Sequence, residues 1–166
     1  MEKNYYITTP IYYVNDKPHI GHAYTSIACD VIARFKRLDG YNVKFLTGTD
    51  EHGQKVEKAA ISQNKSPLEY ADFISKDFRS LTKILNLSND DFIRTTEKRH
   101  KIASENLWKK LYENNHIYLG KYSGWYALKD EAFYSEKEIT NGKAPSGAEV
   151  TWVEEESYFF DLSKWQ

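Results

Sequence analysis

Two strand patterns separated by one long helical pattern fill the first fifty residues, and this order restricts the fold more than any other feature. Residues 5–9 are β-branched and aromatic and stop at Pro10, as a strand does where it leaves a sheet. Residues 20–38 repeat apolar side chains every three or four positions, which predicts a helix, and residues 42–47 predict a second strand. The predicted buried face of the helix consists of Tyr24, Ile27, Ala28, Val31, Ile32, Phe35 and Leu38. Strand, helix and strand at this spacing form a βαβ unit, whose strands are parallel and whose crossover is right-handed.

The alternation of strands and helices continues to residue 115. The further expected elements are a loop at 48–53, a short helix at 54–63, a helix from Pro67, a strand at 92–95 and a helix at 97–114. Ser66 and Glu69 have the spacing of a capping box, which marks the start of the helix at Pro67. Regular alternation of this kind predicts an α/β fold with a doubly wound parallel sheet.

The pattern changes after residue 115. Short aromatic strand candidates separated by Gly, Pro, Asn and Ser follow at 117–127, 132–134, 150–153 and 157–162. Asn141 and Gly142 predict a tight turn between them. We therefore predict two domains, 1–115 with the parallel sheet and 116–166 with a β-rich module. Because an apolar stretch runs almost to Gln166, we expect this second module to be incomplete.

Composition and the lengths of apolar runs exclude several classes of protein. Apolar residues form 40% of the chain, which is enough for a globular core. The longest apolar runs are far shorter than the roughly 18 residues that cross a bilayer, so we expect a cytoplasmic protein without membrane contact. A net charge of −1 gives no global attraction to nucleic acid. With Cys29 as the one cysteine, neither an intramolecular disulfide nor a thiolate metal site can form.

The first motif that carries chemistry is His19-Ile20-Gly21-His22, at the start of the long predicted helix. Unsatisfied N–H groups and the positive end of the helix dipole stabilise a phosphate there. Two imidazoles three residues apart share one face of the first turn, and Gly21 leaves room for a flat ring or a phosphate. The motif suits ATP, although a simple surface pair of histidines is the alternative interpretation.

The second motif is Gly48-Thr49-Asp50-Glu51-His52-Gly53, directly after the second predicted strand. Ligands of an open parallel sheet bind outside the carboxyl ends of its strands, so we expect both motifs to face one crevice. Asp50 could hold the ammonium of an amino acid by a charge-assisted hydrogen bond. Alternatively, Asp50 and Glu51 only complement the dipole of the following helix.

These motifs together resemble a known family. The runs Thr9–Asn15, His19–Tyr24 and Phe45–Gly53 closely resemble the N-terminal catalytic region of bacterial methionyl-tRNA synthetases, which are class I aminoacyl-tRNA synthetases. His19 to His22 fits the HIGH signature of the class, and the second motif is typical of the methionine family. Further runs at 124–126, 130–134 and 154–160 resemble the connective-peptide insertion of the family. The resemblance implies the first half of a Rossmann-like nucleotide-binding sheet, followed by a truncated β-rich connective-peptide insertion.

The resemblance also implies an activity in protein biosynthesis. Methionine and ATP, as its Mg²⁺ complex, would give methionyl-adenylate and pyrophosphate, and the acyl group would pass to tRNA(Met). Carried over to this chain, His19 and His22 are the catalytic residues that bind ATP phosphates, and Gly21 lets the adenine pack closely. The residues implied for methionine binding are Pro10, Ile11, Tyr13 and Asp50. Attack of a carboxylate on phosphorus needs positioning and charge stabilisation rather than a covalent catalyst.

Two features of the family are missing from the 166 residues. The KMSKS loop is absent, and so are the later sheet strands and the anticodon-binding helices, so tRNA(Met) would be bound mostly by other regions and the piece alone should be inactive. Where many relatives carry a Cys-based zinc knuckle, residues 143–149 contain no cysteine. We therefore expect no structural zinc and assign no metal ligand.

Three alternatives remain open at this stage. A nucleotidylyltransferase uses a similar His-x-Gly-His helix start, although its short fold would not contain the aromatic insertion. A metal-dependent hydrolase would use His19, His22, Asp50 and His52 as ligands. A non-catalytic binding fragment would suit an isolated half-sheet, whose edge is left unpaired.

Overall fold

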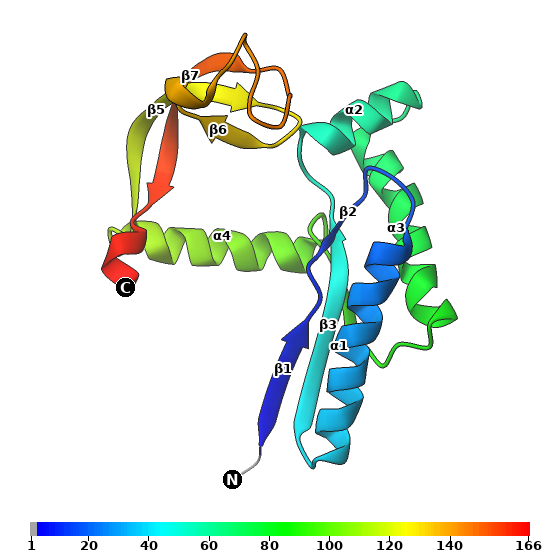
Figure 1. Ribbon diagram of the computed structural model, residues 1–166. Helices are drawn as coiled ribbons and strands as arrows, with labels where there is room; N and C mark the ends of the chain where they lie inside the picture. The colour runs from blue at the N-terminus through cyan, green and yellow to red at the C-terminus, as the bar shows by residue number, and fades with distance from the viewer. Residues whose placement is uncertain (1–2) are drawn as a thin grey trace. The chain divides into compact units, whose positions relative to one another are not determined.

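The computed structural model describes residues 3–166, which form two compact units that divide between Ser104 and Glu105 (Figure 1). The division falls inside helix α4 (Lys98–Glu113). The sequence predicts a boundary between residues 115 and 116, which would separate the parallel-sheet domain from the β-rich module. That boundary stays a prediction. Within residues 3–166, none of the helices combines the length and the apolar character needed to cross a membrane.

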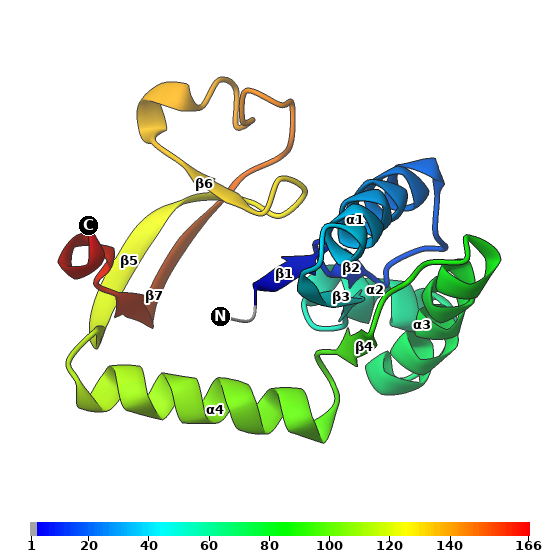
Figure 2. The same cartoon turned by 90° about the horizontal axis from the view of Figure 1, so that it is seen from below.

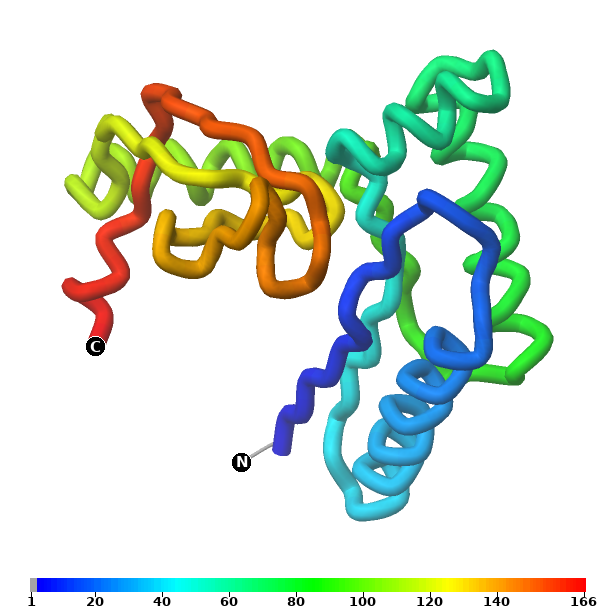
Figure 3. Tube along the Cα trace, turned by 45° about the horizontal axis from the view of Figure 1, so that its top comes forward, coloured from blue at the N-terminus to red at the C-terminus, as the bar shows by residue number. Residues whose placement is uncertain are grey.

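The first unit is built on a parallel sheet centred on β3 (Asn42–Asp50). Strand β1 (Asn4–Thr8) pairs with 42–46 of β3, and the short β2 (Tyr12–Tyr13) pairs with its last two residues. Strand β4 (Asp91–Arg94) lies on the other edge, because Thr49 pairs with both Tyr12 and Arg94. Figure 3 shows β1 beside β3 along the trace. The predicted α/β fold with a parallel sheet is confirmed.

Strand β3 runs three residues further than the sequence predicts. Gly48, Thr49 and Asp50 belong to the strand and not to a loop, because β2 and β4 continue the pairing on both edges. Gly48 permits this close approach: a Cβ at that position would lie 2.0 Å from the carbonyl oxygen of Ile93. The strand therefore carries Asp50 to the carboxyl edge of the sheet.

Helix α1 (Ile20–Leu38) turns a different face to the sheet from the one predicted. Its buried residues are Ser26, Asp30 and Ala33, which share one side of the helix. Ala33 packs against Val43 and Phe45 of β3. All seven residues of the predicted buried face are exposed. The apolar periodicity correctly predicts the helix but not its covered side, because small and polar residues let the helix approach the sheet.

Helices α2 (Gln54–Ser62) and α3 (Pro67–Ile84) enclose the larger core of the first unit. Its buried residues are Tyr12, Val14, Val56, Ala60, Tyr70, Ala71, Ile74, Phe78 and Phe92. Helices α1 and α3 cover the same face of the sheet (Figure 2). The predicted capping box is confirmed, since Glu69 N donates to Ser66 Oγ at 3.3 Å and Ser66 N donates to Glu69 Oε2 at 3.0 Å.

The second unit holds an antiparallel sheet in the order β6, β5, β7. Its strands are β5 (Ile117–Ala127), β6 (Ala132–Tyr134) and β7 (Thr151–Phe160), with short 3-10 turns at Glu136–Glu138 and Leu162–Trp165. The predicted β-rich module is confirmed. Strand β7 is continuous, however, whereas the sequence predicts two pieces, because β5 pairs with it along its whole length and holds the three glutamates 154–156 in the strand.

Aromatic pairs and one tight turn characterise the second unit. Trp125 and Trp152 meet edge to face with ring centroids 5.4 Å apart, and Trp108 of α4 meets Tyr158 in the same way at 5.5 Å. The predicted turn is confirmed at Asn141 and Gly142, which have φ of 53° and 73° and join Thr140 to Lys143 by two backbone hydrogen bonds.

Candidate active site

The carboxyl edge of the sheet in the first unit brings together both sequence motifs. The segments that follow β1, β2 and β4 are all tied to the end of β3. Thr9 N donates to Leu46 O at 3.1 Å, Val14 N to Asp50 O at 3.4 Å, and Thr95 N to Thr49 O at 3.3 Å. The end of β3 is thus fixed from both edges, next to the start of α1.

The two histidines of the first motif cap the helix with their own side chains. His19 is the N-cap residue, and its Nδ1 accepts a hydrogen bond from Gly21 N at 3.1 Å. In return His22 Nδ1 accepts from His19 N at 3.1 Å, and the two rings stack with centroids 3.8 Å apart. Because a backbone N–H only donates, neither Nδ1 carries a proton in these bonds, and each neutral ring has its proton on Nε2. Two N–H donors therefore stand at the positive end of the α1 dipole, an arrangement that favours an anion.

Gly21 is required by this stacked arrangement. A Cβ at position 21 would lie 2.9 Å from Cε1 of His19 and 3.1 Å from its Nδ1. A larger residue would therefore require the His19 ring to shift. The sequence interpretation leaves this space for a ligand. The His19 ring lies beside Gly21 in the structure, and the role of Gly21 in ATP binding stays a prediction.

His22 sits in a partly aromatic surrounding. The rings of Tyr12 and Phe78 meet it edge to face at centroid distances of 4.7 and 5.0 Å. Burial lowers the pKa of His22 below its ordinary value, and the neighbouring imidazole of His19 lowers this pKa further. His22 is therefore neutral at pH 7, which keeps its Nδ1 available as an acceptor.

Tyr12 connects the first motif to the second, a role that sequence reasoning missed. Its side chain is only 7% exposed, and its hydroxyl lies 2.9 Å from Ser26 Oγ and donates to His22 O at 3.3 Å. In β2 the same residue pairs with Thr49 of β3. No local sequence signal indicates this inward direction, because Tyr12, Tyr13 and Val14 do not alternate in polarity and their alternation in burial appears only in the structure.

The structure places the residues predicted for methionine on the same edge. Tyr13 of β2 pairs with Asp50, the last residue of β3, and both side chains are accessible. Pro10 and Ile11 lie exposed in the segment that joins β1 to β2. The four residues are thus brought to one end of the sheet, while their role in binding stays a prediction.

Glu51 differs from the sequence interpretation. It does not complement the dipole of α2, because it is 3% exposed and forms a two-pronged ion pair with Arg94, at 2.7 Å to Nε and 2.9 Å to Nη2. Thr49 Oγ1 also donates to Glu51 at 2.7 Å. Sequence reasoning missed Arg94, since nothing local to the chain shows which arginine lies across the sheet.

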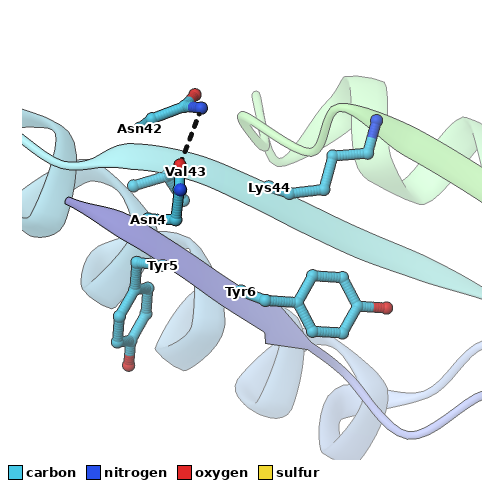
Figure 4. Close-up of a pocket in the computed structure, with 6 residues that line it drawn as sticks. All are labelled: Asn4, Tyr5, Tyr6, Asn42, Val43 and Lys44. Carbon is cyan, nitrogen blue, oxygen red and sulfur yellow. Dashed lines mark hydrogen bonds between the residues drawn. The ribbon is translucent and has the colours of Figure 1, made fainter. Parts of the chain in front are cut away.

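A cavity of about 330 Å³ lies beside this edge, lined by Glu51, His52, Gly53, Gln54, Glu57 and Pro67 among others. His52 is exposed, and its Nε2 lies 3.4 Å from Thr95 O. A second cavity, of about 410 Å³, lies at the amino ends of β1 and β3, where Asn42 donates to Asn4 Oδ1 at 3.0 Å (Figure 4). This second cavity is far along the strands from either motif.

The described residues contain no cluster of three or more His, Cys, Asp or Glu side chains that could hold a metal ion. His19, His22, Asp50 and His52, the ligands of the hydrolase alternative, are therefore not gathered into such a site. The absence of structural zinc from residues 143–149 stays a prediction.

The chain is similar to known proteins over nearly its whole length. The family described as "tRNA synthetases class I (M)" matches residues 5–151. The methionine–tRNA ligase of Rickettsia felis is 65% identical over the whole chain, and that of Bacillus subtilis is 51% identical over 97% of it. The solved Mycobacterium tuberculosis methionyl-tRNA synthetase in complex with methionyl-adenylate matches 98% of the chain at 49% identity, with a TM-score of 0.89. The chain spans 33%, 26% and 33% of these three proteins, about a third of their length or less.

Proposed function

The chain belongs to the class I tRNA synthetase family of the methionine type, and we propose that it is the N-terminal part of a methionine–tRNA ligase. In this proposal, residues 1–115 form the first half of the Rossmann-like catalytic domain and residues 116–166 part of the connective-peptide insertion. The substrates are L-methionine, ATP with its Mg²⁺, and tRNA(Met), which other regions of the enzyme mostly bind. A cytoplasmic location goes with this role in translation.

One observation carries the proposal. The first turn of α1 presents two imidazole Nε2–H donors, and Tyr12 ties that turn to the strand end that holds Asp50. Two N–H donors, which would suit an anion, and a carboxylate thus stand at one end of the sheet. A substrate pair of polyphosphate and amino acid has the matching charges, since the phosphates are anionic and the ammonium is cationic.

The reaction that fits this arrangement is adenylation of an amino acid. A carboxylate oxygen of methionine forms a bond to the α-phosphorus of ATP, while the bond from that phosphorus to the bridging oxygen breaks and pyrophosphate leaves. His19 and His22 stabilise the charge on the phosphates as it shifts in the transition state. Gly21 has no Cβ to meet the His19 ring, and in this proposal the same glycine lets the adenine pack closely when ATP binds.

The same edge of the sheet orients the amino acid. Asp50 binds the ammonium by a charge-assisted hydrogen bond, and Tyr13, Pro10 and Ile11 form one side of the methionine pocket. Binding both substrates in a fixed orientation converts a two-substrate attack into a step within one complex. The acyl group then passes from the adenylate to the 3′-terminal adenosine of tRNA(Met).

The test is methionine-dependent exchange of pyrophosphate into ATP by the full-length ligase. Here full-length ligase means residues 1–166 followed by the remaining two thirds of the length that the relatives have. We expect exchange with L-methionine and none with L-leucine. Exchange that does not depend on the amino acid would contradict the proposal and favour a nucleotidylyltransferase. Residues 1–166 alone should show no exchange.

A further inference from the structure

The most enclosed charged group at the candidate site is the carboxylate of Glu51, whose side chain is fully buried. Its Oε1 accepts from Thr49 Oγ1 and Arg94 Nε, both at 2.7 Å, and its Oε2 accepts from Arg94 Nη2 at 2.9 Å and from Thr96 Oγ1. The same Nη2 also donates to Oδ1 of Asp72, in α3, at 2.6 Å. The end of β3, the end of β4 and α3 are thus joined through one arginine.

Stability alone does not account for such a group. Removing two charges from water costs free energy that their mutual attraction repays only with complete hydrogen bonding, and apolar side chains of similar volume often stabilise a core as well. The pair with Glu51 is two-pronged, which fixes direction as well as distance. The hydrogen bond to Glu51 is also the main reason that the pKa of Arg94 is raised, so its charge is permanent. The network therefore specifies a geometry.

The geometry that it specifies includes the peptide between Asp50 and Glu51. The carbonyl oxygen of this peptide accepts from Val14 N at 3.4 Å, and its N–H donates to Thr95 Oγ1 at 2.9 Å. The peptide plane is therefore held from both edges of β3. The side chain of Glu51, anchored by Arg94, prevents the plane from rotating.

Asp50 is the last residue of β3, and Glu51 follows directly after the strand. The Glu51 side chain is buried, whereas Asp50 remains partly accessible at the edge where β3 leads into α2 (Figure 1). The buried pair thus anchors the residue that follows Asp50 in the chain.

We propose that Glu51 and Arg94 are positioning residues, which hold Asp50 in the direction that binds the ammonium of the amino acid. This inference rests on the proposed function and gives a role to Glu51 of the second motif and to Arg94, two residues to which the resemblance assigns none. A displaced Asp50 would still be charged but would no longer meet the ammonium at hydrogen-bonding distance.

The experiment compares L-methionine with its desamino analogue, 4-(methylthio)butanoate, in the full-length ligase. The affinities of both are measured by competition, together with the KM for ATP. Arg94→Lys keeps the charge but loses the two-pronged contact. We expect it to weaken methionine about 10-fold while the affinity of the analogue and the KM for ATP change by less than about 2-fold.

Two further variants separate positioning from general damage. Arg99→Lys changes another two-pronged pair, between Arg99 of α4 and Asp91 at the opposite end of β4 from Arg94. It should leave every value within about 2-fold of wild type. In an Asp50→Asn background, Arg94→Lys should have no further effect on methionine, because the group that it positions has already lost its charge. If Arg94→Lys does not fold, Glu51→Gln, which keeps the side-chain shape, replaces it in the same measurements.

The outcomes are distinct. Equal loss of methionine and analogue, or additive losses in the double variant, would show a structural role and overturn the inference. Unchanged methionine affinity in both Arg94→Lys and Glu51→Gln would overturn it as well. A wild-type enzyme without methionine-dependent exchange would instead contradict the proposed function.

Discussion

The two ends of β3 are held by different kinds of contact. Near the amino end, Val43 and Phe45 pack against a helix through apolar surface. Near the carboxyl end, Thr47, Thr49 and Glu51 are equally buried but polar, and hydrogen bonds satisfy each of them. Apolar burial gives stability directly, whereas a buried polar group costs free energy unless its partners are in place. The buried polar groups that need their partners in place thus lie at the end of the strand that carries the candidate site.

This difference predicts that substitutions at the carboxyl end change catalysis, while those at the amino end do not. Asn42→Ala is a suitable control throughout, because Asn42 lies in the same strand, is exposed and hydrogen-bonds only to Asn4 among the described side chains. Its effect on activity should stay within about 2-fold.

The largest effect is expected for His22→Ala in the full-length ligase. The substitution removes an Nε2–H donor at the proposed phosphate site and the acceptor for His19 N. Adenylate formation should slow by about 10²–10³-fold, the loss typical of one transition-state donor, with a smaller change in ATP affinity. Single-turnover kinetics at saturating ATP measure this. A loss confined to ATP affinity would mean that His22 does not stabilise the transition state.

Asp50→Asn should mainly weaken the binding of methionine. An amide still forms a hydrogen bond but no longer balances the ammonium charge, so methionine binding should weaken by about 1.5–3 kcal/mol. Separate titrations with methionine and ATP decide the assignment. Weaker ATP binding with unchanged methionine binding would show that Asp50 does not bind the ammonium of methionine.

Gly48→Ala tests the tight pairing at the carboxyl end through stability. The new Cβ would meet the backbone oxygen of Ile93, which cannot move without shifting β4. We expect the free energy of unfolding to fall by about 1–3 kcal/mol, against less than about 0.5 kcal/mol for Asn42→Ala. Urea denaturation of the full-length ligase gives both values. Equal stability of the two variants would show that β3 and β4 approach less closely.

The smallest effect concerns pH. The pKa of His22 is lowered in the folded protein from the ordinary histidine value of 6.5. At pH values just below 6.5 the unfolded chain therefore binds more protons than the folded protein does. This contribution to stability is therefore complete above pH 6.5 and is lost as pH falls through the pKa of folded His22. NMR titration should place the His22 midpoint below 6.5, and His22→Gln should lose this part of the pH dependence. A midpoint above 6.5 would contradict the described surroundings of His22.

Local sequence patterns were sufficient for much of the fold. The capping box at Ser66 and Glu69 and the turn at Asn141 and Gly142 form as predicted, because each depends on residues that are neighbours in the chain. The parallel sheet also follows from local order, since a strand, a helix and a strand leave few ways to connect. The approach of both motifs to one edge is a consequence of that topology.

The remaining features depend on contacts across the fold. The predicted buried face of α1 was wrong, because apolar periodicity does not show which face of a helix packs against the sheet. The burial of Glu51 could not be predicted, since a charged residue becomes a core residue only where a partner such as Arg94 lies opposite. Tyr12 was recognised as part of a motif, but its link from β2 to α1 needs the three-dimensional register.

A crystal structure of the full-length ligase with a non-hydrolysable methionyl-adenylate analogue tests the central claim most directly. We predict the ammonium within about 3.2 Å of an Asp50 carboxylate oxygen and the phosphate at the Nε2 atoms of His19 and His22. An analogue bound at the amino end of β3, near Asn4 and Asn42, or an ammonium held by another side chain, would contradict the assignment of the site.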